Sequence, residues 1–317
     1  MYQKFYGLRE MPFELTPNPD YLYLTAGHRE ALSNLQYGLS TAKAVTLLVG
    51  EAGMGKTTLL RAAIESEWCR SVRCVSVNNP TLTRNEFIEI LARSFSLSAA
   101  ASHSKAVLLD ELECVLRERR ANGEITALVI DEAQSLSTDL LEEIRLLANI
   151  ETSTEKLLPL VLAGQPELSA RLDEPGLRQL RQRVALRCEM APFGLSETAG
   201  YIASRIKTAG GVARRLFTRE AVTLVHRFSG GIPRTISVIC DNALITGLAL
   251  GRQPVDQGIV SEVCGDLHLR EVSTPLPDAR GGPAAIEAND DGPAPATEEV
   301  FGRSAPARRF TLFGSRR

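Results

Sequence analysis

Eight consecutive residues have the types and spacing of a loop that binds phosphate. They follow the pattern Gly-x-x-x-x-Gly-Lys-Thr and comprise Gly50, Glu51, Ala52, Gly53, Met54, Gly55, Lys56 and Thr57. Glycines let successive backbone N–H groups curl around phosphate oxygens at the start of a helix. Lys56 is expected to reach the β and γ phosphates and the Thr57 hydroxyl to ligate Mg²⁺, with Thr58 adjoining the site. The pattern predicts a site for ATP and Mg²⁺.

Two acidic residues, Asp131 and Glu132, follow the apolar run Ala127–Ile130. An apolar run of this length indicates a buried strand, whose carboxyl end would lie beside the phosphate loop. There Asp131 can hold the Mg²⁺ shell, and Glu132 can polarise the attacking water. The alternative is that two acids simply begin the next helix near its positive dipole end.

Gln165 and Arg234 are two further candidates for contact with the γ-phosphate. Gln165 follows an apolar strand that ends in Leu-Ala-Gly, so its amide would emerge at the same edge of the sheet. There it can sense the phosphate or orient water, unless it is an ordinary loop amide. Arg234 closes the stretch Gly-Ile-Pro-Arg at the start of a helix and can reach across a cleft between two domains, or bond to local carbonyls.

Four arginines lie within ten residues that contain no acid, namely Arg178, Arg181, Arg183 and Arg187. One use of such a cluster is an arginine finger that enters the ATP site of a neighbouring subunit. Contact with DNA phosphates and a solvated helix face are the alternatives. Asn78 and Asn79 close another expected strand, where an amide can restrain the catalytic carboxylate, although a turn before Pro80 explains them as well.

Alternating strands and helices must position these side chains. Apolar runs predict strands at 44–49, 72–77, 127–130, 157–163 and 185–189, and helices are expected at 28–41, 56–67, 83–94, 104–121 and 137–150. Continuous apolar strands separated by helices indicate a parallel sheet covered on both faces. The fold class expected is therefore α/β, a three-layer P-loop NTPase domain.

The remainder of the chain has a different pattern. Helical periodicity at 196–209, 218–229, 233–249 and 256–268 predicts an all-helical lid domain. We expect four parts: an N-terminal arm (1–27) packed on the ATPase domain, that domain (28–192), the lid (193–270) and a disordered tail (271–317). The tail holds six of the sixteen prolines, and residues 302–317 contain five Arg and no acid.

The amino-acid composition indicates the cellular compartment of the protein but not the reaction that it catalyses. With 36 basic and 38 acidic residues, the net charge of −2 gives no global attraction to nucleic acid or to an anionic membrane. The six cysteines form no Cys-x-x-Cys pair, which favours a reducing, cytoplasmic setting. The N-terminal residues lack the pattern of a signal peptide, and no apolar run is long enough to span a bilayer. We expect a cytoplasmic protein that can lie at the periphery of the inner membrane.

The phosphate loop, Asp131-Glu132, Gln165 in Ala-Gly-Gln-Pro-Glu-Leu, Arg183 in Arg-Gln-Arg-Val and Gly-Ile-Pro-Arg together resemble the AAA+ ATPases. Residues 1–270 are similar to the ExeA or general secretion pathway protein A type, which is close to transposition ATPases of the TnsC and TniB kind. The opening Tyr-Gly-Leu, the Pro-Asp-Tyr-Leu-Tyr stretch and His28 match that type. The resemblance implies ring or filament assembly, with Arg183, then Arg181, as the finger and Arg234 as a second sensor.

Three functions follow from this resemblance. The first is an ATPase that drives or regulates assembly of an envelope secretion, polysaccharide-export or pilus machine. The larger secretion members of the family have a membrane helix and a peptidoglycan-binding domain, and neither is apparent in this sequence. The resemblance is therefore to shorter members associated with pilus, exopolysaccharide or exosortase systems. The second is a DNA-binding regulator of transposition. The third is a nucleotide-gated scaffold with little turnover. A small-molecule kinase is less suitable, since it gives the lid helices no role.

Overall fold

A five-stranded parallel sheet is the centre of the first half of the chain. In a computed structural model that describes residues 1–15, 21–77 and 81–272, the strand order is β2-β3-β4-β1-β5. The strands are β1 (Val45–Gly50), β2 (Val72–Val77), β3 (Ile125–Ile130), β4 (Leu160–Gly164) and β5 (Val184–Met190). Every neighbouring pair is parallel, so all carboxyl ends meet at one edge.

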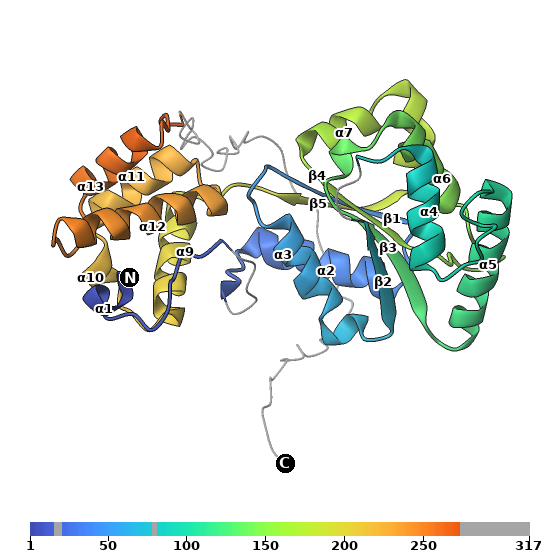
Figure 1. The fold of residues 1–317 in the computed structure, drawn as a ribbon, viewed down its shortest axis with the longest axis horizontal. Helices are drawn as coiled ribbons and strands as arrows, with labels where there is room; N and C mark the ends of the chain where they lie inside the picture. The colour runs from blue at the N-terminus through green and yellow to red at the C-terminus, as the bar shows by residue number, and fades with distance from the viewer. Residues whose placement is uncertain (16–20, 78–80, 273–317) are drawn as a thin grey trace, which may run out of the picture. The chain divides into compact units, whose positions relative to one another are not determined.

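Helices cover both faces of this sheet (Figure 1). One face carries α2 (Ala26–Ser40) and α3 (Lys56–Ile64), and the other carries α4 (Arg84–Ser94), α5 (Lys105–Ala121), α6 (Thr138–Leu147) and α7 (Pro166–Leu172). The alternation of β1 explains the two cores: Leu47 and Val49 pack on the α4–α7 side, whereas Leu48 packs on the α2–α3 side. The predicted three-layer α/β domain is confirmed.

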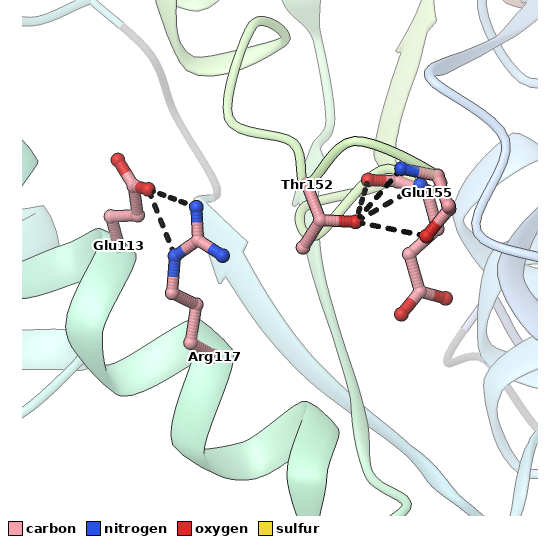
Figure 2. Close-up of polar contacts among 5 residues, drawn as sticks. Glu113, Arg117, Thr152 and Glu155 are labelled. Atoms are coloured by element: carbon pink, nitrogen blue, oxygen red, sulfur yellow. Dashed lines mark hydrogen bonds and ion pairs between the residues drawn. The ribbon is translucent and has the colours of Figure 1, made fainter.

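Short elements complete this half of the chain. They are the 3-10 turns η2 (Glu67–Cys69), η3 (Ala133–Ser135) and η4 (Pro175–Leu177) and the single-turn helix α8 (Arg178–Arg181). Strand β4 begins at Leu160, three residues later than expected, and residues 151–156 before it form a tight turn in which the Thr152 hydroxyl bonds the backbone of Glu155 (Figure 2). Figure 2 also shows an ion pair on the exposed face of α5, where Arg117 bonds Glu113 at 2.6 Å. Neither feature touches the carboxyl edge of the sheet.

The second half is all helical, as expected. It consists of α9 (Leu195–Thr208), α10 (Ala213–Leu216), α11 (Arg219–Ser229), α12 (Pro233–Ala249) and α13 (Gln257–Asp266). Its apolar side chains, from Phe193 onward, form a separate core that also takes in part of the N-terminal arm, whereas the last buried residue of the sheet core is Met190. Residues 1–274 form one compact unit, so the domain boundary at 192/193 remains a prediction that the division of the cores supports.

The N-terminal arm packs differently from the expectation. Its short helix α1 (Gln3–Tyr6) and the buried Leu8 and Phe13 belong to the core of the helical region, not to the ATPase domain. The Tyr2 hydroxyl bonds Asp241 of α12, and the Arg9 N–H donates to Ala209 at 2.8 Å. The prediction that the arm packs on the ATPase domain is therefore wrong for residues 2–13, because their aromatics bury against helices that are far away in sequence, whereas Leu24 packs against the core of the sheet.

The C-terminal boundary also shifts. Glu271 and Val272, which we assigned to the tail, pack on α11: the Val272 N–H donates to Arg227 at 2.9 Å, and Arg227 pairs with Glu271. The remainder of the predicted tail, 273–317, lies outside the described residues, as do Asn78 and Asn79. Within residues 1–15, 21–77 and 81–272, no helix combines the length and the apolar character needed to cross a bilayer.

Candidate nucleotide-binding site

The predicted phosphate loop joins β1 to α3 at the carboxyl edge of the sheet. Gly53 and Gly55 adopt φ angles of 81° and 90°, in the left-handed region that glycine tolerates best. The buried Lys56 ammonium donates to the carbonyls of Gly50 at 2.8 Å and Glu51 at 3.1 Å. Burial lowers the pKa of Lys56, and the charges of Glu132 and Asp131 oppose that effect. The loop therefore holds its lysine beside two carboxylates.

Thr57 and Asp131 form the pair that we predicted as Mg²⁺ ligands. The Thr57 hydroxyl donates to Asp131 Oδ2 at 2.6 Å, which brings the first turn of α3 to the end of β3. Both side chains offer oxygen, the donor that Mg²⁺ prefers, and such sites use one or two protein ligands together with substrate phosphates. No cluster of three or more His, Cys, Asp or Glu suited to a metal ion occurs in the described ranges. The pair fits a phosphate-bound Mg²⁺ rather than a protein cage.

Glu132 lies directly beyond this pair in an unusual backbone conformation. Its φ of 56° and ψ of 36° are left-handed, which is costly for a residue with a side chain and is typical of functional sites. The conformation turns the chain sharply after β3, and the Glu132 side chain is exposed. Its carboxylate accepts a 2.6 Å hydrogen bond from Gln134 Nε2. Gln134 was not identified from the sequence, where a glutamine two residues after an acid carries no signal.

Gln165 directly follows β4 at the carboxyl edge of the sheet, and Gln134 connects it to Glu132. Its backbone N–H donates to Gln134 Oε1 at 3.1 Å, and it is the N-cap residue of α7. In the sheet register, Gly164 pairs with Val49 of β1, so Gln165 is level with the start of the phosphate loop. The charge of Glu167, two residues further on, acts on Lys56. The carboxyl edge therefore brings Lys56, Glu132 and Gln165 together.

Arg234 reaches the phosphate loop from the helical region. Its backbone N–H donates to the Gly53 carbonyl at 3.2 Å, and a Cβ added to Gly53 would lie 2.8 Å from Arg234 Cβ. Its side chain is exposed and lines the same cavity as the loop. Pro233 begins α12, where its missing N–H costs nothing, and so directs Arg234 toward the loop. The Gly-Ile-Pro-Arg stretch therefore lies against the phosphate loop, and contact of the Arg234 side chain with a γ-phosphate remains a prediction.

The loop opens into a cavity of about 330 Å³, whose far wall comes from the arm and the helical region. His28 of α2 also lines the cavity: its ring centroid is 5.2 Å from that of Phe193, and its Nδ1 lies 2.8 Å from the Thr25 hydroxyl. Burial lowers the pKa of His28, against the opposing charge of Glu197. We identified His28 only as a helix-start residue. Other lining residues that the sequence did not reveal are Tyr21, Tyr23, Tyr201, Arg205 and Ser237.

Arg183 and Arg181 lie away from this cavity. Arg183 precedes β5, whose first residue pairs with Val45 at the start of β1, whereas the phosphate loop follows the end of β1. Six residues of strand, about 20 Å, separate the two ends. Arg181 pairs with Asp173 at 3.2 Å, and the buried Arg183 Nε has no hydrogen-bond partner in the described part of the chain. Neither arginine reaches the phosphate loop of its own chain.

Comparisons with known proteins agree with this architecture. Residues 40–172 match the model of an AAA domain family. A curated relative, general secretion pathway protein A of Aeromonas hydrophila, is 40% identical over 261 residues, which are 82% of this chain. The chain spans 47% of the length of that relative. The carboxyl-edge motifs and the AAA match therefore coincide in the same part of the sequence.

Solved structures share the fold at low identity. The ORC2 protein of Aeropyrum pernix, in its ADPNP-ADP complexes, has a TM-score of 0.60 at 17% identity and covers 83% of this chain and 72% of its own. CDC6P from Pyrobaculum aerophilum gives 0.60 at 17%, over 80% and 70% of the two chains. A Drosophila ORC bound to DNA gives 0.61 at 19%, over 81% and 64%. These likenesses extend across the sheet domain and the helical region.

Proposed function

The chain belongs to the AAA+ P-loop proteins and is a relative of general secretion pathway protein A, and on that premise we propose that it binds ATP with Mg²⁺ and hydrolyses it. One observation carries the proposal: the phosphate loop, the Thr57–Asp131 pair and the Glu132 carboxylate converge at one edge of the sheet. A loop that only holds a nucleotide needs no exposed carboxylate beside its lysine. Hydrolysis does.

Each residue has a chemical role in this proposal. Backbone N–H groups of residues 53–57 cradle the phosphates, and Lys56 exchanges its loop carbonyls for phosphate oxygens. Thr57 and Asp131 would hold a Mg²⁺ ion, which would supply positive charge to the phosphates. Glu132 accepts a proton from the attacking water. Gln165 and Arg234 report on the γ-phosphate from two sides, one from β4 and one from the helical lid.

The position of Arg183 and Arg181 supports assembly of several copies. Because about 20 Å of strand separates them from their own phosphate loop, they can act on ATP only in a neighbouring copy. We therefore infer a ring or filament in which each ATP site is completed by an arginine finger from the next subunit. Arg183 is the first choice, since its buried Nε makes no hydrogen bond among the described residues.

The process that uses this ATPase is inferred from the curated relative. Since that protein is named for the general secretion pathway, we propose that the chain drives or regulates assembly of an envelope secretion, polysaccharide-export or pilus machine from the cytoplasmic side of the inner membrane. A DNA-binding regulator of transposition is supported less well. Two of its proposed phosphate contacts, Arg181 and Arg187, already pair with Asp173 and Glu189.

The proposal is tested by comparing two variants with the wild-type protein. Glu132→Gln keeps the shape of the site but removes the base, so we expect ATP to bind within about twofold of wild type while kcat falls at least about 100-fold. Lys56→Ala should instead abolish ATP binding itself. Unchanged turnover in purified Glu132→Gln would rule out this assignment of the base, and a chain that binds ATP but never turns it over would favour the scaffold.

A further inference from the structure

The side chain of Gln134 connects two groups at the carboxyl edge of the sheet, the Glu132 carboxylate after β3 and the Gln165 backbone N–H after β4. Gln134 Nε2 donates to Glu132 Oε2 at 2.6 Å, after β3. At the other end of the same carboxamide, Oε1 accepts from the Gln165 backbone N–H at 3.1 Å, after β4. The carboxamide therefore uses one donor and its acceptor to span the gap between the proposed base and the proposed γ-phosphate sensor.

The surroundings of Gln134 fix where this carboxamide lies. Its backbone carbonyl accepts from Arg171 Nη1 at 2.8 Å, and the same nitrogen donates to the Leu136 carbonyl at 2.6 Å. Arg171 thus ties α7 to the turn η3 from the side opposite the carboxamide. Gly164 leaves room for the amide oxygen, because a Cβ there would lie 2.9 Å from Gln134 Oε1. The half-buried side chain has little freedom to point elsewhere.

A restraint of this kind matters for Glu132 more than for most acids. The Glu132 side chain is exposed, so packing does not fix its rotamer, and its left-handed backbone places it on a sharp turn. A charge-assisted hydrogen bond to one oxygen restricts the carboxylate and leaves Oε1 available to a water molecule. A displacement of about 1 Å at a reacting group can cost roughly 100-fold in rate.

We propose that Gln134 is a positioning residue that holds the Glu132 carboxylate in its orientation and couples it to the chain at Gln165. This inference rests on the proposed ATPase function. Any movement of the β4 end, such as one that follows contact between Gln165 and a γ-phosphate, passes through the Gln134 carboxamide to the base. Glu132 lines the cavity that holds the phosphate loop and Gln134 does not, so the effect of Gln134 in this proposal is exerted through Glu132.

The test is a double-mutant cycle between positions 134 and 132. Gln134→Met removes both hydrogen-bonding groups at nearly constant size, and Ser135→Ala is the matched control, since Ser135 is exposed in the same turn. Each change is made in the wild-type protein and in Glu132→Gln. Steady-state kcat and KM, single-turnover hydrolysis of radiolabelled ATP, and equilibrium Kd for ATP and ADP are measured for all variants.

We expect Gln134→Met to lower kcat about 10- to 100-fold while KM and both Kd values stay within about twofold of wild type. In the Glu132→Gln background, the same change should have no further effect on single-turnover hydrolysis, because the side chain it would position is no longer a base. Ser135→Ala should behave like its parent in both backgrounds. A general loss of folding would lower activity in both backgrounds and would also weaken nucleotide binding. A decrease in kcat alone, seen only when Glu132 is present, therefore separates positioning from misfolding.

Two outcomes would overturn the inference. If Gln134→Met turns over at the wild-type rate while Glu132→Gln does not, the ATPase proposal stands and the role of Gln134 is wrong. If Gln134→Met weakens hydrolysis equally in both backgrounds, Gln134 acts by a route other than Glu132. Full turnover in Glu132→Gln would instead refute the assignment of Glu132 as the base, and only a wild-type protein that binds ATP without turning it over would contradict the proposed ATPase function.

Discussion

The Phe193 N–H donates to the Gly231 carbonyl at 2.9 Å, at the point where the chain passes from β5 into the helical region. Gly231 has a φ of 78°, and a Cβ added there would lie 2.1 Å from the Phe193 carbonyl oxygen. Three residues later, Arg234 bonds to Gly53 of the phosphate loop. Residues 231–234 therefore contact both the connection between the two regions, at Phe193, and the phosphate loop, at Gly53. The close approach of Phe193 leaves no space for a side chain at residue 231.

A substitution at Gly231 should be far more damaging than one at a comparable glycine. Gly251 also has a positive φ, 62°, but a Cβ there would meet nothing within 4 Å. Gly251→Ala should then cost about 1 kcal/mol, the usual cost of this conformation. Gly231→Ala adds a clash with backbone, so we expect at least about 2 kcal/mol more, measured by urea unfolding. It should also weaken ATP binding. Equal losses in the two variants would contradict this account of Gly231.

Mixed assemblies test whether the arginine finger acts between copies. Arg183→Ala keeps its own base but lacks the finger, whereas Glu132→Gln keeps the finger but lacks the base. Each alone should lose about 1,000-fold or more in kcat. Random 1:1 mixing should restore about a quarter of the wild-type rate, because one site in four combines an intact base with an intact finger. Arg178→Ala should remain active. A mixture that assembles but stays inactive would exclude this arrangement.

Stability should fall in alkaline solution because of buried thiols. Burial raises the pKa of Cys74 and of Cys188 to about 11 in the folded chain, above the roughly 8.5 of a free thiol. The thiols therefore stabilise the fold below about pH 8.5, and this contribution is lost as the pH rises toward 11. Urea unfolding from pH 7 to 10.5 should show the decline.

The slope of the free energy of unfolding against pH, above pH 8.5, identifies which thiols cause the loss of stability. Cys188 is only 3% exposed, so Cys188→Ala should be less stable at pH 7 by about 1 kcal/mol, yet lose stability less steeply with pH. Cys114 is exposed, so Cys114→Ala should follow the wild-type curve. If Cys188→Ala kept the full alkaline slope, thiol burial would not be its cause.

The centre of the sheet was predictable because every residue of β1, β3 and β4 is buried, which gives continuous apolar runs. The run at 72–77 coincides with β2, and Thr83 forms the capping box with Glu86 that their spacing indicates. The convergence of Asp131, Glu132 and Gln165 followed from parallel topology alone, since the carboxyl ends of parallel strands share an edge. Local pattern and global architecture agree in this half of the chain.

Other features depend on contacts that no local pattern encodes. Gln134 links Glu132, the proposed base, to Gln165, the proposed sensor, only because Glu132 turns left-handed and Gly164 leaves room, and neither condition is visible in the sequence. The aromatics of the arm indicated burial but not the surface that buries them. His28 shows a similar limit: its position at a helix start was correct, while its place in the cavity wall depends on Phe193, far along the chain.

The anchoring of the arm by Arg205 determines where the smallest autonomous folding unit begins. Its guanidinium binds the carbonyls of Pro12 and Glu14 and stacks on the Tyr21 ring, while the same side chain lines the nucleotide cavity. A fragment trimmed to residue 28 would keep every phosphate-binding group, yet it would uncover apolar surface on the helices and remove one wall of the cavity. The arm contributes no phosphate-binding group, yet it completes the core of the helical region and one wall of the cavity.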